Sequence, residues 1–269
     1  MIGAIVYRLR AGKPARLPVF HGRLLHGAVF HILHEFSPEL AAAVHDGRNS
    51  KPFTVSLLKR EQRKKEQDRH ELLIRAGDIF YWRVTALDEV MLQAFLSLPA
   101  GTGLPVGEAS FEVEDVIADG RWETGMLDEA DLIAEALAVP KVQSIAFEFC
   151  SPVSFRNYER DYPFPLPELV FGSLADKWLQ NELPVDLDRQ HIKEMARPLR
   201  LLEWEGKSQK VYFAKDRGML AFTGQFRFET SILPLECQQL FLMLAQFATF
   251  AGVGRLTGQG FGRTRVHYR

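Results

Sequence analysis

A histidine and a lysine lie close together in the stretch VHDGRNSK, near the N-terminus. Leu40 and Val44 share one face of a predicted short helix, which leaves His45 about 100° from that face in the last turn. The carboxyl end of a helix favours a cationic side chain, which suits an imidazole that transfers protons. Lys51 follows a segment of small and polar residues, including Asn49 and Ser50, that lets it bend toward His45. From these residues alone, a histidine bonded to a helix carbonyl and a surface lysine explain the pattern better.

Two further histidines, His31 and His34, lie on the helix predicted from Phe20 to Phe36. On a helical wheel, one face of this helix is basic and aromatic and the opposite face is apolar. The first face carries Arg23, Gly27, Phe30 and His34, and the second carries Leu25, Val29, Ile32 and Phe36. The first face is suited to a polyanion with stackable rings. Both histidines are explained equally well as solvated helix residues.

A zinc site is not expected on this helix. His26, His31 and His34 do not share a face, because the 26–31 spacing directs those side chains apart.

The densest run of glycines, GVGRLTGQGFG, precedes the last predicted strand. Neither nucleotide-binding fingerprint fits, because the run has no lysine and Thr257 stands where GxGxxG requires its third glycine. Glycine allows positive φ and close approach of a backbone to a ligand. With the arginines around it, the run predicts a phosphate-binding loop, although a tight structural turn explains the glycines almost as well. The residues are Gly252, Gly254, Gly258, Gly260, Gly262, Arg255, Arg263 and Arg265.

The elements that position these residues follow one order twice. Strands are predicted at Ile2 to Leu9, FTVSLL, ELLIRA, IFYWRVTAL and Ala109 to Ile117, with helices at Phe20 to Phe36 and Asp88 to Leu98. Ser37, Pro38 and Glu39 open a short helix that Gly47 ends. After Pro140 the pattern restarts with IAFEFCSPVSF, then the helix PELVFGSLADKWLQNEL, the strands RLLEWEG, KVYFAK and MLAFTGQFRF, a helix from Leu235 to Phe250, and the strand RTRVHYR.

Two β-α-β-β-α-β units predict an α+β fold of two tandem ferredoxin-like domains, with the glycine-rich loop near the C-terminus. The expected domains are residues 1–140 and 141–269.

Composition agrees with a globular protein in a reducing compartment. The 269 residues are 46% hydrophobic and 25% charged, and the two cysteines, Cys150 and Cys237, do not form a metal-binding or disulfide pattern. Residues 1–75 carry 14 Lys and Arg against 7 Asp and Glu, and residues 237–269 carry 4 against 0, so both ends are basic. A polyanion is therefore an expected partner if both ends lie on one face. The apolar stretch from Leu240 to Gly254 is too short for a membrane span, and a cytoplasmic location is expected.

The sequence resembles the CRISPR repeat-processing endoribonucleases of the RAMP superfamily. GVGRLTGQGFG before a short final strand is similar to their glycine-rich signature. PLPELVFGSLADKWL resembles the helix that opens their second domain, and GAVFHILHEFSPELAAAVHDGRNSKPFTVSLL resembles their N-terminal stretch. The glycine-rich signature also occurs in members that bind RNA without cutting it, so the N-terminal stretch carries the expectation of nuclease activity.

The resemblance implies metal-independent cleavage in which the RNA's 2′-hydroxyl attacks, giving a 2′,3′-cyclic phosphate and a 5′-hydroxyl. His45 and Lys51 fall on the family's histidine and lysine. Phe30 occupies a position that is commonly tyrosine, and phenylalanine donates no hydrogen bond. His31 or His34 is the expected compensation.

No cofactor or metal is expected, and CRISPR repeat RNA is the expected partner. The alternative is a non-catalytic RNA-binding subunit of a CRISPR effector complex, or a two-domain protein whose glycine loop is only a turn. Binding to other subunits of such a complex, and a monomer or a homodimer, remain open.

Overall fold

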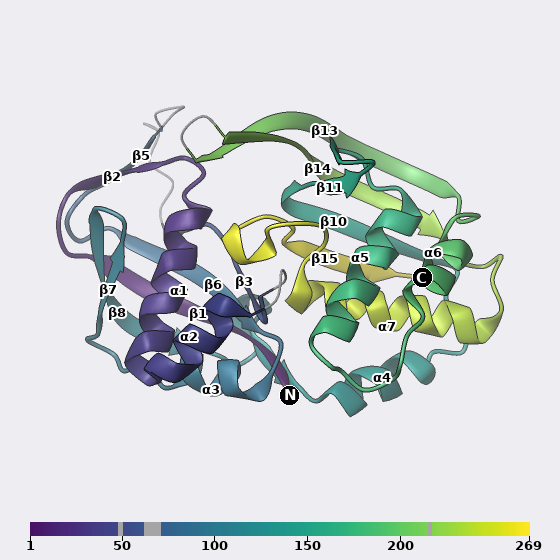
Figure 1. Cartoon of the computed structure of the whole chain (residues 1–269), viewed down its shortest axis with the longest axis horizontal. Coiled ribbons are helices and arrows are strands. Elements are labelled where there is room, and N and C mark those ends of the chain that lie inside the picture. Colours follow the sequence, from purple (N-terminus) through teal and green to yellow (C-terminus); the bar gives the residue numbers. More distant parts are fainter. Residues whose placement is uncertain (48–50, 62–70, 215–216) are drawn as a thin grey trace. The chain divides into compact units, whose positions relative to one another are not determined.

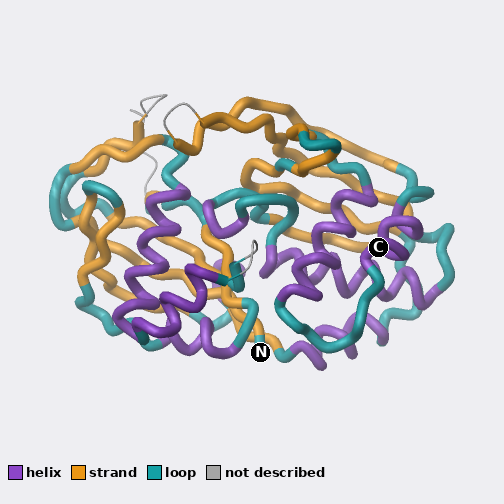
Figure 2. The backbone as a smooth tube through the Cα atoms, viewed as in Figure 1, coloured by secondary structure: helices purple, strands orange, loops and turns teal. Residues whose placement is uncertain are grey.

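The structure, a computed structural model, describes residues 1–47, 51–61, 71–214 and 217–269. It divides into two compact units. The N-terminal unit contains residues 1–126, 213–215 and 258–260, and the C-terminal unit contains 127–212, 216–257 and 261–269. Each combines helices with strands (Figure 2), and the strands of each main sheet pair antiparallel, which confirms the predicted α+β class. The domain boundary expected near Pro140 stays a prediction.

The N-terminal unit is built on an antiparallel sheet whose order is β3-β6-β1-β8-β7 (Figure 1). Its four main strands occur in the spatial order 2-3-1-4 when numbered along the chain, which is the ferredoxin-like arrangement. The strands are β1 (Ile2–Ala11), β3 (Phe53–Val55), β6 (Ile79–Ala86), β7 (Gly103–Val106) and β8 (Ala109–Ile117), with β4 (Lys59–Arg60) on β6 and β9 (Gly125–Leu127) on β1. The helices are α1 (Gly22–Phe36), α2 (Pro38–Asp46) and α3 (Glu89–Leu96), with a short 3-10 turn, η1 (Arg121–Glu123).

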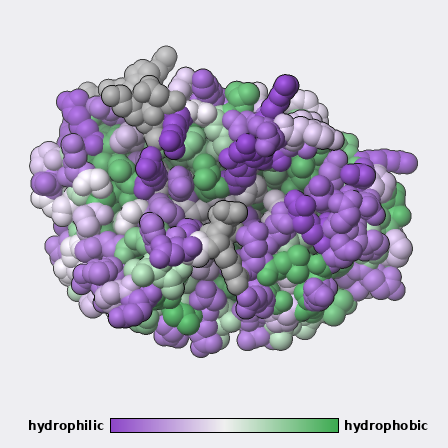
Figure 3. Space-filling model, viewed as in Figure 1, coloured by the Kyte–Doolittle hydropathy of each residue, from purple (hydrophilic) through white to green (hydrophobic). Residues whose placement is uncertain are grey.

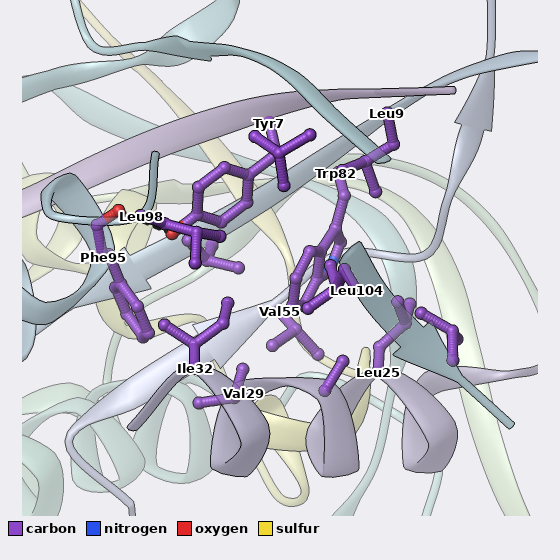
Figure 4. Close-up of a cluster of buried hydrophobic side chains, with 14 of the residues drawn as sticks. Tyr7, Leu9, Leu25, Val29, Ile32, Val55, Trp82, Phe95, Leu98 and Leu104 are labelled. Atoms are coloured by element: carbon purple, nitrogen blue, oxygen red, sulfur yellow. Dashed lines mark hydrogen bonds between the residues drawn. The ribbon is translucent and has the colours of Figure 1, made fainter. Parts of the chain in front are cut away.

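Alternating side chains of this sheet meet the apolar stripe of α1. Leu25, Val29 and Ile32 of α1 lie against Tyr7 and Trp82 of the sheet (Figure 4), and all five side chains are buried. The Tyr7 hydroxyl donates a hydrogen bond of 2.7 Å to the Phe95 carbonyl oxygen, so its polar end is satisfied inside the core. Each large apolar side chain buried here stabilises the fold by roughly 1.5–3 kcal/mol.

The corner between α1 and α2 forms as the sequence predicts. Ser37 is extended, and its Oγ accepts a hydrogen bond from the Leu40 amide while Pro38 occupies the first turn. Gly47 ends α2 and donates its amide to the Ala43 carbonyl oxygen. One expectation was wrong: Phe36, placed on the buried face of α1, is 43% exposed because it stands at the end of the helix, where the chain turns into α2.

The C-terminal unit repeats the ferredoxin-like order in the sheet β13-β14-β10-β15. The strands are β10 (Ser144–Val153), β13 (Leu201–Ala214), β14 (Arg217–Glu229) and β15 (Thr264–Tyr268), and the helices that correspond to the predicted pair are α5 (Pro167–Gln180) and α7 (Leu235–Ala251). Edge-on and tilted ring contacts among Phe147, Phe171 and Phe241 join the sheet to both helices.

The structure also differs from the predicted elements. RLLEWEG and KVYFAK form the single long strand β13 instead of two strands. The ELLI segment is a strand, β5 (Glu71–Ile74), but it pairs with β2 (Ala15–Pro18) in a separate ribbon. Three further features were not predicted: α4 (Glu129–Leu137), α6 (Arg189–Ala196) and the ribbon of β11 (Phe155–Asn157) and β12 (Arg160–Tyr162).

Hydrophilic residues cover much of the face drawn in Figure 3, and hydrophobic residues lie between them in separate patches. Within the described ranges, every helix is too short or too polar to cross a membrane.

Candidate active site

Lys51 and His45 meet at the carboxyl end of α2. The Lys51 ammonium donates hydrogen bonds to the carbonyl oxygens of Val44, His45 and Gly47, at 2.7, 2.8 and 2.8 Å. The last carbonyls of a helix have no partner within the helix, so Lys51 caps α2 and is held beside His45. Asn49 and Ser50, which were expected to let the loop bend, lie outside the described residues.

The His45 side chain is 75% exposed, and its Nδ1 lies 3.0 Å from Asp46 Oδ1. Because Asp46 is also exposed, this contact is worth well under about 1 kcal/mol and does not fix the ring strongly. His45 is therefore open to an incoming ligand.

Phe30 connects His45 to a second histidine, His26. The Phe30 ring meets His45 edge-on with centroids 5.7 Å apart, and it meets His26 edge-on at 5.0 Å. Phe53 lies against both His26 and Phe30, at 5.4 and 6.1 Å. Phe30 is half-buried and packs against the core of the N-terminal unit. Its expected role in stacking on RNA stays a prediction, but packing already accounts for part of its surface.

His26 is held in one tautomer. Its Nδ1 lies 2.8 Å from the Gly258 carbonyl oxygen, which only accepts hydrogen bonds, so the neutral ring carries its proton on Nδ1 and leaves a lone pair on Nε2. Burial lowers the pKa of His26; the bond to Gly258 opposes this shift, and the positive charges of Lys51, His45 and Arg23 add to it. A neutral imidazole at neutral pH is the form that a general base requires.

His26 was not predicted as a catalytic residue, because its spacing from His31 and His34 was considered only as that of a zinc ligand. The available signal was its spacing of four residues from Phe30, which places both rings on one face of α1.

The two helix histidines proposed from the sequence lie elsewhere. His31 is half-buried and His34 is exposed, and His34 is close enough to Glu39 to lower the pKa of that carboxyl, after a backbone and a Ser37 hydrogen bond. Neither ring contacts His45 or Lys51 among the residues that the structure describes. Arg23 is exposed on α1. The catalytic roles of His31 and His34 stay predictions, without geometric support.

Part of the glycine-rich segment belongs to the N-terminal unit and packs on the start of α1. Gly258 bonds His26, and the Gly260 backbone lies against Leu57 and Gly22. A Cβ on Gly22 would come within 1.8 Å of the Gln259 carbonyl oxygen, so only glycine allows this approach. The segment thus fixes the ring of His26.

The rest of the glycine-rich segment is folded tightly in the C-terminal unit. The amides of Gly252, Gly254 and Gly262 donate to the Ala248 carbonyl oxygen, Ser173 Oγ and the Pro152 carbonyl oxygen. Gly262 has a φ of +75°, and a Cβ there would lie 2.3 Å from the Val253 carbonyl oxygen. These three amides are engaged within the protein, so the glycines of this part are explained by the turn itself. Their role in RNA binding stays a prediction.

The three arginines of this region are also engaged. Arg255 Nη1 lies 3.1 Å from Asp161 Oδ1, and Arg265 Nη1 lies 3.2 Å from Glu148 Oε1. The Arg263 amide donates to Ser151 Oγ. Both ion pairs are partly exposed, so an anionic ligand competes with them at a cost of about 1 kcal/mol or less.

The described residues contain no group of three or more histidine, cysteine or acidic side chains placed to hold a metal ion. The arrangement that they do contain joins a neutral imidazole, an exposed imidazole and an ammonium group. Such a set provides a base, an acid and a positive charge for displacement at phosphorus.

Comparisons with known proteins identify the family of the chain. Residues 3–125 match the family described as the CRISPR Cas6 N-terminal domain, and residues 147–264 match the one described as CRISPR-associated endoribonuclease Cas6. A solved Cas6 (TTHB231) product complex is similar over 99% of each chain, with 28% identity and a TM-score of 0.80, and this Cas6 is from Thermus thermophilus. A Cas6 (TTHA0078) product complex, at 24% identity and a TM-score of 0.74 over 99% of each chain, shares the fold. A comparison with curated proteins gave no match.

The two family matches follow one another along the sequence and together span most of it. The solved structures are similar over nearly its full length. The chain therefore belongs to the Cas6 family of CRISPR-associated endoribonucleases.

Proposed function

We propose that this chain cuts CRISPR repeat RNA without a metal ion, using the 2′-hydroxyl at the cut site as nucleophile. His26 Nε2 takes the proton of that hydroxyl, and the 2′-oxygen forms a bond to the adjacent phosphorus. The bond from phosphorus to the 5′-oxygen breaks, and His45 gives a proton to the departing oxygen. The products are a 2′,3′-cyclic phosphate and a 5′-hydroxyl.

One observation carries this proposal: His26 and His45 contact the same Phe30 ring, and the Lys51 ammonium is anchored next to His45. Lys51 supplies positive charge for the oxygens of the transition state, where charge increases as the new bond forms. His26 supplies the proton-transfer group that Phe30 lacks, so the compensation expected from His31 or His34 is assigned to His26 instead.

RNA as the substrate is supported by the relatives. The similar solved structures include a Cas6 (TTHB231) product complex and a Cas6 (TTHA0078) substrate mimic complex. We assign RNA binding to the glycine-rich segment and to Arg255, Arg263 and Arg265. Arg255 and Arg265 can exchange their carboxylate partners for phosphates. A cytoplasmic location, contacts with other CRISPR subunits and the choice between monomer and homodimer stay predictions.

Cleavage of a repeat-containing RNA in EDTA tests the reaction. The parental chain is expected to cut under these conditions and to leave a 5′-hydroxyl, which polynucleotide kinase labels without prior phosphatase treatment. His45→Ala is expected to slow single-turnover cleavage by about 10²–10⁴-fold, the usual cost of losing a general acid or base. Its affinity for RNA is expected to stay nearly unchanged, because the contacts of the His45 side chain with described residues are an exposed contact with Asp46 and an edge-on contact with Phe30.

The control is a repeat RNA with 2′-deoxyribose throughout, which has no nucleophile and is expected to remain intact. Cutting of this control, or cutting that stops in EDTA, would contradict the 2′-hydroxyl mechanism. Binding without cutting by the parental chain would instead favour the non-catalytic subunit.

A further inference from the structure

The C-terminal unit carries a small projecting hairpin formed by β11 and β12. Asn157 pairs with Arg160, so only Tyr158 and Glu159 form the turn. Tyr158 is 92% exposed, more than any other large hydrophobic residue that the structure describes. Arg156 and Arg160 on the two strands are exposed as well. The tip therefore presents an aromatic ring between two cations.

The backbone of this turn is strained. Tyr158 and Glu159 have φ values of +47° and +61°, and positive φ at both central residues is the pattern of a type I′ turn. Asn-Gly is the preferred sequence for that turn, because most side chains are disfavoured at positive φ. A tyrosine and a glutamate stand here instead. Such strain persists where the surroundings enforce it, and it is concentrated at ligand-binding positions.

The base of the hairpin is fixed from both sides. Phe155 is buried and stacks on Phe222, with centroids 6.1 Å apart. Asp161, which pairs with Arg156 across the strands, forms the 3.1 Å ion pair with Arg255 of the glycine-rich segment. The Arg255 amide also donates to the Ser154 carbonyl oxygen, at 3.0 Å. These contacts join the hairpin to the segment to which RNA binding is assigned.

We propose that Tyr158 is an RNA-binding residue that stacks on one unpaired nucleobase, with Arg156 and Arg160 beside the adjoining phosphates. This inference rests on the proposed function. Single-stranded nucleic acid is held by aromatic rings set among cations, which is the chemistry of this tip. Paired RNA fits it less well, because the major groove of an A-form helix is too narrow for side chains to read the bases.

The test compares three variants by their affinity for a fluorescein-labelled repeat RNA with 2′-O-methyl sugars, which cannot be cut by 2′-hydroxyl attack. Tyr158→Asn suits the turn but removes the ring, and it is expected to weaken binding about 10-fold, the usual worth of one stacked base. Tyr158→Phe keeps the ring and is expected to bind like the parental chain. Glu159→Gly relieves the strain and keeps the ring, so its affinity should be unchanged and its melting temperature equal or higher.

Two further readouts separate stacking from other effects. The slope of affinity against salt concentration should be the same in Tyr158→Asn as in the parental chain, because no phosphate contact is lost. Repeat RNA carrying 4-thiouridine should crosslink under ultraviolet light to the peptide that contains Tyr158, as identified by mass spectrometry. If Tyr158→Asn lowers the melting temperature, its loss of affinity could come from partial unfolding. The crosslink then tests the contact between Tyr158 and RNA in the parental chain, whose fold is unchanged.

Equal RNA affinity of Tyr158→Asn and the parental chain, or the absence of the crosslink, would overturn the assignment while leaving the proposed function intact. A parental chain that does not bind the repeat RNA at all would overturn both.

Discussion

The two histidines that contact Phe30 differ in how deeply they are buried. His26 is half-buried and bonded to a carbonyl, and burial lowers its pKa. The His45 side chain is 75% exposed at the end of α2. Two imidazoles with different surroundings are suited to different steps, since one is required neutral as a base and the other protonated as an acid. The local environment of each ring, and not its identity, determines the role that we assign to it.

The assignment of His26 as the base predicts the pH dependence of cleavage. The base acts when neutral, so the single-turnover rate should rise with pH through the pKa of His26. Because that pKa lies below its ordinary value of 6.5, the rising limb should have its midpoint below 6.5. The measurement is the second-order rate constant of single-turnover cleavage in EDTA, taken well below saturation over a series of pH values, because this constant reports the pKa of the chain without bound RNA.

His26→Asn keeps a hydrogen-bond donor near Gly258 and removes the base. It should lose the rising limb and most of the rate, while His31→Ala and His34→Ala should retain both. A rising limb that persists in His26→Asn, or an indispensable His31 or His34, would transfer the role of base to another group.

The site could be predicted from the sequence only in part. His45 and Lys51 are near neighbours in the chain, so a helix end and a short loop suffice to bring them together. His26 gains its significance from Gly258, which lies 232 residues away in the sequence. The periodicity of neighbouring residues cannot predict a contact between residues so far apart in the sequence. His31 and His34 were favoured because they are histidines on the same helix, but one residue of rotation turns a side chain about 100° around the axis.

At the scale of elements, α5 holds one side of the glycine-rich segment. The buried Lys177 ammonium donates to the carbonyl oxygens of Ala251 and Gly252 at 2.9 and 2.8 Å, and Ser173, one turn earlier, accepts from the Gly254 amide at 3.2 Å. These bonds satisfy the carboxyl end of α7 and set the direction in which the chain leaves it. Burial lowers the pKa of Lys177 to about 7, although the charge of Asp176 opposes the shift.

Lys177→Met should therefore change stability in a pH-dependent way. The pKa of Lys177 is about 7 in the folded chain and 10.5 when unperturbed, so the unfolded state binds more protons between these values. The free energy of unfolding of the parental chain consequently rises with pH across this window, and the variant lacks that contribution. At the upper end the variant should be less stable by about 1–3 kcal/mol, because two buried carbonyls lose their donor. Urea denaturation between about pH 7 and pH 10 measures both effects.

The matched control is Lys141→Met, which makes the same substitution at an exposed position. Its stability should follow the parental curve at every pH. A constant difference between Lys177→Met and the parental chain would show that Lys177 titrates normally in the folded state.

Helices and strands whose ends and periodicity depend on neighbouring residues could be predicted from the sequence. The Ser37 cap, the strand from Ala109 to Ile117 and the helix ending at Ala251 depend on neighbouring residues, and their sequence patterns predict them closely. Pairing partners are not local. The residues Glu71–Ile74 predict a strand, but they do not indicate whether it joins the main sheet or a separate ribbon. Its pairing with Ala15–Pro18 places it in the ribbon. Likewise Gly206 interrupts the pattern within β13 without ending the strand, because it packs against Thr223 and Phe226 of β14.

At the scale of the whole molecule, the net charge of −1 conceals basic ends, but many of the cations there are already paired. Arg8 and Arg10 both bond Glu114, and Arg255 and Arg265 pair with carboxylates of the C-terminal unit. The Arg255 and Arg265 pairs are partly exposed and contribute little to stability. They keep the arginines ordered, and a phosphate can replace the carboxylate as the partner of each.

Electrostatic binding predicts a steep loss of RNA affinity with salt. Each phosphate contact to single-stranded RNA contributes about 0.7 to the slope of log affinity against log salt concentration, through release of bound counterions. Arg255→Ala should therefore weaken binding and reduce the slope by about 0.7, while the single-turnover rate at saturating RNA stays near the parental value.

Arg189→Ala is the matched control, because Arg189 also pairs with a carboxylate, that of Asp176, but lies on α6 and is assigned no RNA contact. The measurement is a set of titrations at several salt concentrations with uncleavable repeat RNA. A flat salt response of the parental chain would refute electrostatic binding. A lower rate with unchanged affinity in Arg255→Ala would instead place Arg255 among the catalytic groups.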